Sequence, residues 1–233
     1  MEMALFVRRM AVGAMMLLLV AGVRAEELEY RYELGAMVGG STYYGDANYS
    51  SPFNNMNVMG GVIWRYNINP RMAVKSNFAV ARISGSTIDG ENRFPGGDVD
   101  FACTLLELGA QYELHFSAYG NGEGYKGTKR LAPYIFAGAG VTYAPETVKG
   151  VVTANIPLGV GLKFKVAPRL NLGCEISYRF TFSDELDVVK KGQLSLKDPY
   201  GIESGFMKNK DSYSFLSFSV TYDLSPKYRK CNN

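Results

Sequence analysis

The stretch LNLGCEISYRFTF, residues 170–182, alternates between apolar and polar side chains without a break. Because successive residues of a strand point to opposite faces, the apolar side chains share one face, while Glu175 and Arg179 share the other. Strands average about 5–6 residues, whereas a tilted strand needs roughly 9–11 to cross a bilayer. The length and the alternation together predict a transmembrane strand with lipid on one face and a polar lumen on the other.

The amino-terminal end has the three parts of a secretory signal peptide. Arg8 and Arg9 precede an apolar run over residues 10–21, and the cleavage pattern Val23-Arg24-Ala25 follows. A run of about a dozen residues is too short for a spanning helix, which needs roughly 20. We therefore predict a cleaved signal peptide over 1–25, a barrel over 26–226 and a basic tail over 227–233.

The two-residue period recurs along the chain, and no later segment reaches 18 continuous apolar residues. A closed barrel is then the structure that can cross a membrane with its backbone hydrogen bonds satisfied. We predict an all-β fold, an eight-stranded antiparallel transmembrane β-barrel in the outer membrane of a Gram-negative bacterium, in contact with its lipids. The predicted strands cover residues 29–40, 56–67, 72–83, 101–116, 131–143, 153–166, 170–182 and 212–224.

The composition excludes several classes of function. Without the predicted signal peptide the chain keeps 22 of 25 basic and 21 of 22 acidic residues, because Arg8, Arg9, Arg24 and Glu2 are removed. A net charge near +1 argues against a nucleic-acid partner. The three cysteines, at 103, 174 and 231, have no metal-binding spacing. Cys103 and Cys174 fall on opposite faces of their strands, so we expect no disulfide between them.

The residues predicted to face the lumen are nearly balanced in charge. An eight-stranded barrel is just wide enough for its own side chains to fill. We therefore predict a salt-bridged interior without an open pore, in which inward glycines at 138, 140, 159 and 161 make room for long charged side chains. The predicted lumen network comprises Arg31, Glu33, Arg65, Lys75, Glu107, Glu113, Lys163, Lys165, Glu175, Arg179 and Asp223.

The sequence gives no support for catalysis. Small outer-membrane enzymes that act on lipid acyl chains commonly need a histidine beside a serine, and the single histidine, His115, is placed by the register at the periplasmic end of its strand. We interpret it as a structural residue. We predict no catalytic residues, no metal, no cofactor and no small-molecule substrate.

The connection SAYGNGEGYKGTKR, residues 117–130, is long for a periplasmic turn. It is either a solvated flexible loop or a contact surface, since tyrosines are enriched at interfaces and basic side chains bind carboxylates. On the second interpretation the carboxy-terminal tail would contribute as well. The candidate partner-binding residues are Tyr119, Tyr125, Lys126, Lys129, Arg130, Lys227, Arg229 and Lys230.

Three segments resemble the PorG-like outer-membrane barrels of the Bacteroidota type IX secretion system. They are ELGAMVGGSTYYGD (Glu33 to Asp46), WRYNINPRMAVK (Trp64 to Lys75) and APYIFAGAGVTYAP (Ala132 to Pro145). The resemblance implies a non-catalytic barrel that anchors or positions the secretion machinery through a periplasmic ring formed by PorK and PorN. The alternative is a general structural or adhesin-like small barrel that acts through its extracellular loops.

Overall fold

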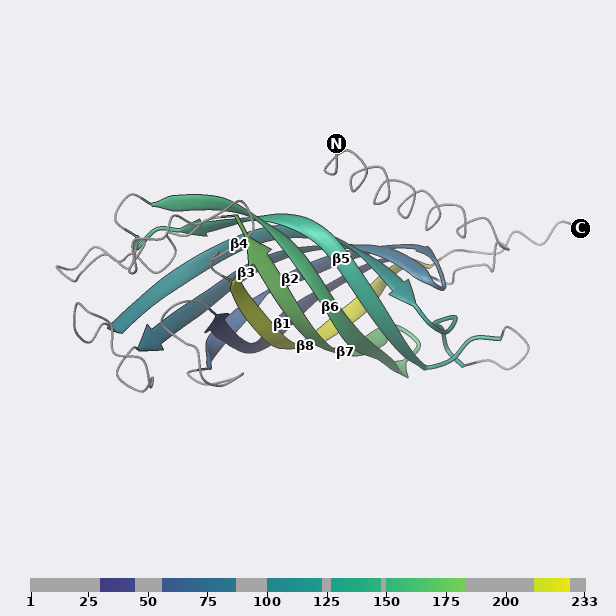
Figure 1. The fold of residues 1–233 in the computed structure, drawn as a ribbon. Coiled ribbons are helices and arrows are strands. Elements are labelled where there is room, and N and C mark those ends of the chain that lie inside the picture. The colour runs from purple at the N-terminus through teal and green to yellow at the C-terminus, as the bar shows by residue number, and fades with distance from the viewer. Residues whose placement is uncertain are drawn as a thin grey trace, which may run out of the picture.

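The structure is a computed structural model that describes residues 30–44, 56–86, 100–122, 127–147, 150–182 and 212–226. Eight tilted strands form one closed antiparallel barrel (Figure 1), in which each strand pairs with its neighbours in sequence and β1 pairs with β8. This confirms the predicted fold class. The strands are β1 (Tyr30–Tyr44), β2 (Asn57–Asn69), β3 (Met72–Ser86), β4 (Asp100–His115), β5 (Leu131–Ala144), β6 (Val151–Ala167), β7 (Leu170–Thr181) and β8 (Ser212–Pro226).

The barrel has an apolar outer surface and a largely polar interior. Along β6 every second side chain is buried over most of the strand, and the exposed set includes Leu158, Val160 and Leu162. Val58 on β2 is 81% exposed, whereas the Glu113 carboxylate is fully buried. This reverses the arrangement of a soluble protein and matches a barrel whose outer face is covered by lipid. The protein is accordingly an outer-membrane β-barrel. No helix among the described residues is long and apolar enough to cross a membrane.

The two ends of the barrel differ in their connections. Residues 70–71 join β2 to β3, residues 168–169 join β6 to β7, and residues 116–130 join β4 to β5 at the same end. We call this the turn end, and it is the periplasmic end of such barrels, where connections are short. The opposite, loop end carries the connections 45–56, 87–99, 145–150 and 182–211. Most of these residues lie outside the described ranges, as do the predicted signal peptide and the tail.

Several strands extend beyond their predicted bounds at the loop end. β1 continues to Tyr44, and its last residues pair with β8 as far as Tyr44↔Ser212. Ser41, Thr42 and Tyr43 are all buried there, so the apolar and polar alternation that marks the membrane band stops before the hydrogen-bonded ladder does. The sequence pattern therefore underestimates strand length, because backbone pairing continues above the lipid-facing band.

Candidate functional site

The interior divides into two chemically different halves. The turn half holds most of the buried charged side chains. The loop half holds an apolar cluster that includes Met59, Ile83, Leu105 and Phe215. The prediction of a salt-bridged interior therefore describes only part of the lumen. The apolar half was missed, although its residues occupy inward positions of their strands in the sequence.

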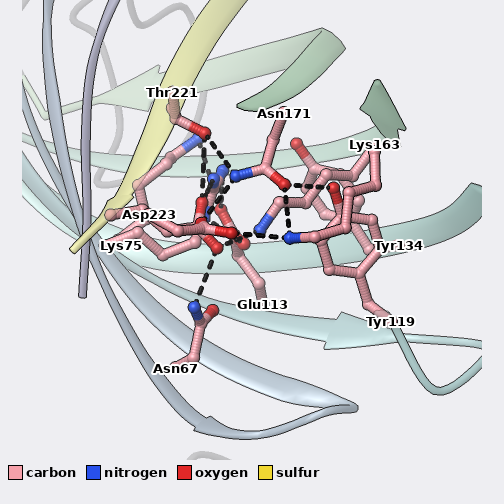
Figure 2. Close-up of polar contacts among 12 residues, drawn as sticks. Asn67, Lys75, Glu113, Tyr119, Tyr134, Lys163, Asn171, Thr221 and Asp223 are labelled. Carbon is pink, nitrogen blue, oxygen red and sulfur yellow. Dashed lines mark hydrogen bonds and ion pairs between the residues drawn. The ribbon is translucent and has the colours of Figure 1, made fainter. Parts of the chain in front are cut away.

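Glu33 of β1 is a central acceptor of the ionic network. Its carboxylate accepts a hydrogen bond from Nη1 of Arg65 at 2.7 Å and another from the Lys163 ammonium on the far side of the barrel. The Asn67 amide donates at 2.8 Å and the Thr221 hydroxyl at 3.2 Å to the same group. Four donors from three strands, β2, β6 and β8, therefore neutralise and solvate one buried charge, and Figure 2 labels Asn67, Lys163 and Thr221 among them.

Arg65 binds three carboxylates at once. Besides Glu33, its Nε lies 2.8 Å from Oε2 of Glu113, and its Nη2 lies 3.7 Å from Oε1 of Glu175. Glu175 also receives the Lys75 ammonium at 2.5 Å and a hydrogen bond from the Tyr134 hydroxyl at 2.6 Å. A planar guanidinium with five donors suits this bridging position better than an ammonium would.

Two further ion pairs extend the network along the barrel axis. Lys165 on β6 contacts Asp223 on β8 at 2.6 Å. Arg179 on β7 contacts Glu107 on β4 at 2.6 Å, and its guanidinium lies 3.8 Å from the centre of the Phe215 ring. Arg179 is thus the contact between the ionic half and the apolar cluster, because its charge faces a carboxylate and its flat side faces an aromatic ring.

The buried charges of the predicted network balance, and one predicted member, Arg31, does not belong to it. Ten of the eleven predicted network residues are buried in the interior, five basic and five acidic. The eleventh, Arg31, was predicted to face the lumen but is exposed, because it is the second residue of β1 and lies at the rim of the barrel. Equal numbers of opposite charges matter here, since a buried charge without a partner is costly.

The inward glycines of β6 have a role that differs from the prediction. A Cβ at Gly161 would meet the ring of Tyr134, and one at Gly159 would meet the ring of Phe136 at 2.5 Å. Among the nearest atoms to the inward glycines of β5, Gly138 and Gly140, are backbone atoms of β4. These glycines therefore leave room for aromatic rings and for the backbone of neighbouring strands. The prediction that they make room for long charged side chains is wrong.

The turn end is covered by part of the β4–β5 connection. Ala118 is buried, and Tyr119 donates its backbone N–H to the carbonyl of Pro70 at 2.9 Å. The Tyr119 hydroxyl donates to Oδ1 of Asn171 at 2.6 Å, and the Lys163 ammonium lies 4.4 Å from the centre of its ring. Burial, followed by the nearby Glu33 and Asp223 carboxylates, raises the pKa of Tyr119 well above its usual range. The neutral phenol is thus the form that suits this position.

This arrangement changes the interpretation of the candidate partner-binding residues. Tyr119 faces the lumen, so its prediction as an outward interface anchor is wrong. Lys129 and Arg130 are exposed, and the Arg130 side chain donates to the carbonyl of Asn121 at 3.0 Å. The remaining candidates, Tyr125, Lys126, Lys227, Arg229 and Lys230, lie outside the described residues.

His115 occupies the turn end, where the register placed it. Its ring stacks on Tyr119 with centroids 6.0 Å apart and packs against Tyr134 at 5.0 Å. Among the described residues, no group of three or more His, Cys, Asp or Glu side chains is arranged to hold a metal ion. With Tyr119 and Tyr134, the His115 ring forms an aromatic cluster beneath the connection.

Solved structures of small outer-membrane barrels share this fold. The Neisserial surface protein A is 12% identical, with a TM-score of 0.51 over 83% of this chain and 97% of that one. Ail, the attachment invasion locus protein of Yersinia pestis, is 14% identical in its complex with the heparin analogue sucrose octasulfate, with a TM-score of 0.47 over 84% and 100%. The likeness concerns the fold alone.

Comparison with curated protein sequences finds no significant match. A protein-family model described as a domain of unknown function, DUF6089, matches residues 9–233. The match spans the predicted barrel and its tail, and it indicates no catalytic family. The chain therefore belongs to the DUF6089 family.

Proposed function

We propose that the protein is a non-catalytic outer-membrane barrel that anchors or positions the type IX secretion machinery through contact with its periplasmic ring. The sequence resemblance to PorG-like barrels supports the identity of the machinery, with PorK and PorN as the ring proteins. The barrel would act as a fixed membrane anchor, and its turn end would be the docking surface.

One observation carries the proposal. The β4–β5 connection is held on the barrel by Ala118 and Tyr119, while Lys129 and Arg130 in the same connection are exposed. A tethered backbone loses less conformational entropy on binding than a free loop does. Exposed basic side chains on such a support are suited to charge-assisted hydrogen bonds with carboxylates of a periplasmic protein.

The filled lumen supports an anchoring role over a transport role. The interior of a porin is a water-filled channel. In this barrel, charged and aromatic side chains from all sides meet across the turn half, and apolar side chains meet across the loop half. An eight-stranded barrel filled in this way provides a rigid support for a contact at one end.

The proposal is tested by reversing the two exposed charges. Lys129→Glu with Arg130→Glu should leave the barrel folded, because neither ammonium nor guanidinium joins the described ion pairs of the interior. Co-purification of PorK and PorN from gently solubilised envelopes should fall strongly, and secretion should fall with it. Arg82→Glu on β3, an exposed charge nearer the loop end, is the matched control.

If the double variant co-purifies with PorK and PorN as well as the parent does, Lys129 and Arg130 do not form the docking surface. The alternative, a structural or adhesin-like barrel that acts through its outer loops, predicts that neither variant changes recovery of ring proteins. It also predicts that replacing residues 183–211 by a short turn abolishes function while the turn end is intact. The two functions thus differ in which end of the barrel must be kept intact for activity: the turn end for docking, the loop end for the alternative.

A further inference from the structure

The exposed charges that the structure describes at the turn end all have the same sign. Among the described residues, the exposed charged side chains of that end are Arg31, Arg71, Lys129, Arg130 and Arg169, and none of them is acidic. At the loop end the described exposed charges are Arg82 and Glu146. We call the five basic residues of the turn end the basic collar.

The basic collar encircles the barrel. Arg31 lies at the start of β1, Arg71 between β2 and β3, Lys129 and Arg130 before β5, and Arg169 between β6 and β7. Because the strands follow chain order around the barrel, these positions are spread over its whole circumference. A protein partner usually contacts one patch, whereas lipid headgroups surround a barrel on every side.

The collar lies at the depth of the headgroups. Arg71 follows the exposed Ile68 by three residues, Arg130 directly precedes the exposed Leu131, and Arg169 follows the exposed Val166 by three residues. Three strand residues rise about 10 Å along a strand, and less along the axis of a tilted one. Since the headgroup layer is about 5–7 Å thick on each side, long arginine side chains at these positions can reach the phosphates.

Arg169 shows how one position of the collar is built. Its guanidinium lies 5.8 Å from the centre of the Tyr30 ring, and its Nη1 donates to the Tyr222 hydroxyl at 3.4 Å. Tyr222 is 46% exposed on the lipid-facing side of β8. Aromatic rings of this kind mark the membrane–water interface, and a guanidinium held beside them retains donors in a geometry that suits phosphate.

We propose that the basic collar binds the phosphates of anionic phospholipids in the periplasmic leaflet of the outer membrane. The ring-shaped distribution and the depth favour a lipid surface over an acidic protein. Arg31, Arg71 and Arg169 lie outside the β4–β5 connection, so the inference for these three arginines does not depend on the proposed docking function, which uses only Lys129 and Arg130 of the collar. It predicts a preference for anionic over zwitterionic lipids around the turn end.

The chain carries its own probe for this preference. Trp64 is the single tryptophan, it is 49% exposed on the outer face of β2, and β2 ends at the turn that holds Arg71. The purified full chain is reconstituted in phosphatidylcholine, and quenching of Trp64 by brominated phosphatidylglycerol is compared with quenching by brominated phosphatidylcholine. The ratio reports the relative association of the anionic lipid near Trp64.

We expect phosphatidylglycerol to associate about two- to fivefold more strongly than phosphatidylcholine at low salt, and less so at high salt. Arg71→Gln should bring the ratio close to one. Arg169→Gln removes the same charge at the β6–β7 turn, remote from Trp64 in the strand order, and should change the ratio less. Arg82→Gln near the loop end should leave it unchanged. A heat-modifiability gel verifies that each variant is folded.

Equal quenching by both lipids in the parent would overturn the inference, as would indistinguishable ratios for Arg71→Gln and Arg82→Gln. Loss of an acidic periplasmic protein from Arg71→Gln preparations, with an unchanged lipid ratio, would also overturn it and make the collar a protein surface. The docking proposal fails on a different measurement, ring recovery by the Lys129 and Arg130 variant, so the two failures are distinguishable.

Discussion

At the scale of single residues, Arg65 has the largest share in the ionic network. Its guanidinium reaches three buried carboxylates, those of Glu33, Glu113 and Glu175, between 2.7 and 3.7 Å away. Buried ion pairs often add little net stability when compared with apolar replacements of the whole pair. Removal of one member is different, because it leaves the opposite charge buried without compensation.

We therefore predict that Arg65→Met lowers the free energy of unfolding by about 3–5 kcal/mol. Urea unfolding of the barrel in lipid vesicles measures the effect. A second replacement, Glu113→Gln, removes one of the stranded carboxylates and should recover part of the loss. Arg82→Met, an exposed arginine of β3, is the control and should stay within about 0.5 kcal/mol of the parent. Equal stability of the Arg65 and Arg82 variants would contradict this account of the network.

At the scale of elements, the β4–β5 connection combines a fixed part with an exposed part. Its backbone is tied to the barrel through Tyr119 N–H to the Pro70 carbonyl at 2.9 Å, and its two halves are joined by Lys129 N–H to the Ala118 carbonyl at 2.7 Å. The Tyr119 side chain adds contacts with three residues of the barrel: its ring with Lys163 and His115, and its hydroxyl with Asn171. A second backbone hydrogen bond, from Lys165 N–H to the Arg130 carbonyl at 2.9 Å, ties the other end of the connection to β6.

We predict that Tyr119→Ala releases the connection and speeds tryptic cleavage after Lys129 and Arg130 about tenfold or more, because about 1.4 kcal/mol of lost local stability changes an opening equilibrium tenfold. Tyr119→Phe keeps the ring and its cation–π contacts and loses only the hydrogen bond to Asn171, so its cleavage should be closer to that of the parent. Timed digestion in lipid nanodiscs gives the rates. If the alanine variant is cut at the parental rate, the connection is held by other contacts.

At the scale of the whole molecule, the barrel has two successive barriers across its lumen. Five basic and five acidic side chains are buried in the described interior, most of them in the turn half, and the loop half places Ile83, Leu105 and Phe215 in a buried apolar cluster. Ions would have to break paired charges in the first half and lose their hydration in the second. Both steps are costly in a narrow lumen.

We predict that the purified protein shows no large, stable conductance in planar lipid bilayers. A general porin of known conductance, reconstituted in the same bilayers, verifies that open channels would be detected. Steady porin-sized channels from the folded barrel would contradict the filled interior. The measurement also bears on function, because a stable channel would favour transport over anchoring.

The sequence alone determined the number of strands and the face that most strand residues present. This follows from geometry, since a two-residue period fixes the faces of a strand and the length of the alternating runs matches a bilayer. Residues 170–182 carried that argument, and β7 spans Leu170–Thr181 in the structure. The face assignment also placed ten of the eleven predicted network residues in the interior.

The tertiary structure decided which inward residues meet. Lys163 pairs with Glu33 across 130 positions of sequence, and Tyr213 pairs with Glu107 across 106, so closure of the barrel creates these contacts and no local pattern encodes them. Closure likewise gathered the inward apolar residues of several strands into one cluster and turned Tyr119 into the mouth. Periodicity assigns a side chain to a face, whereas stagger and curvature of the closed sheet set its height and its partners.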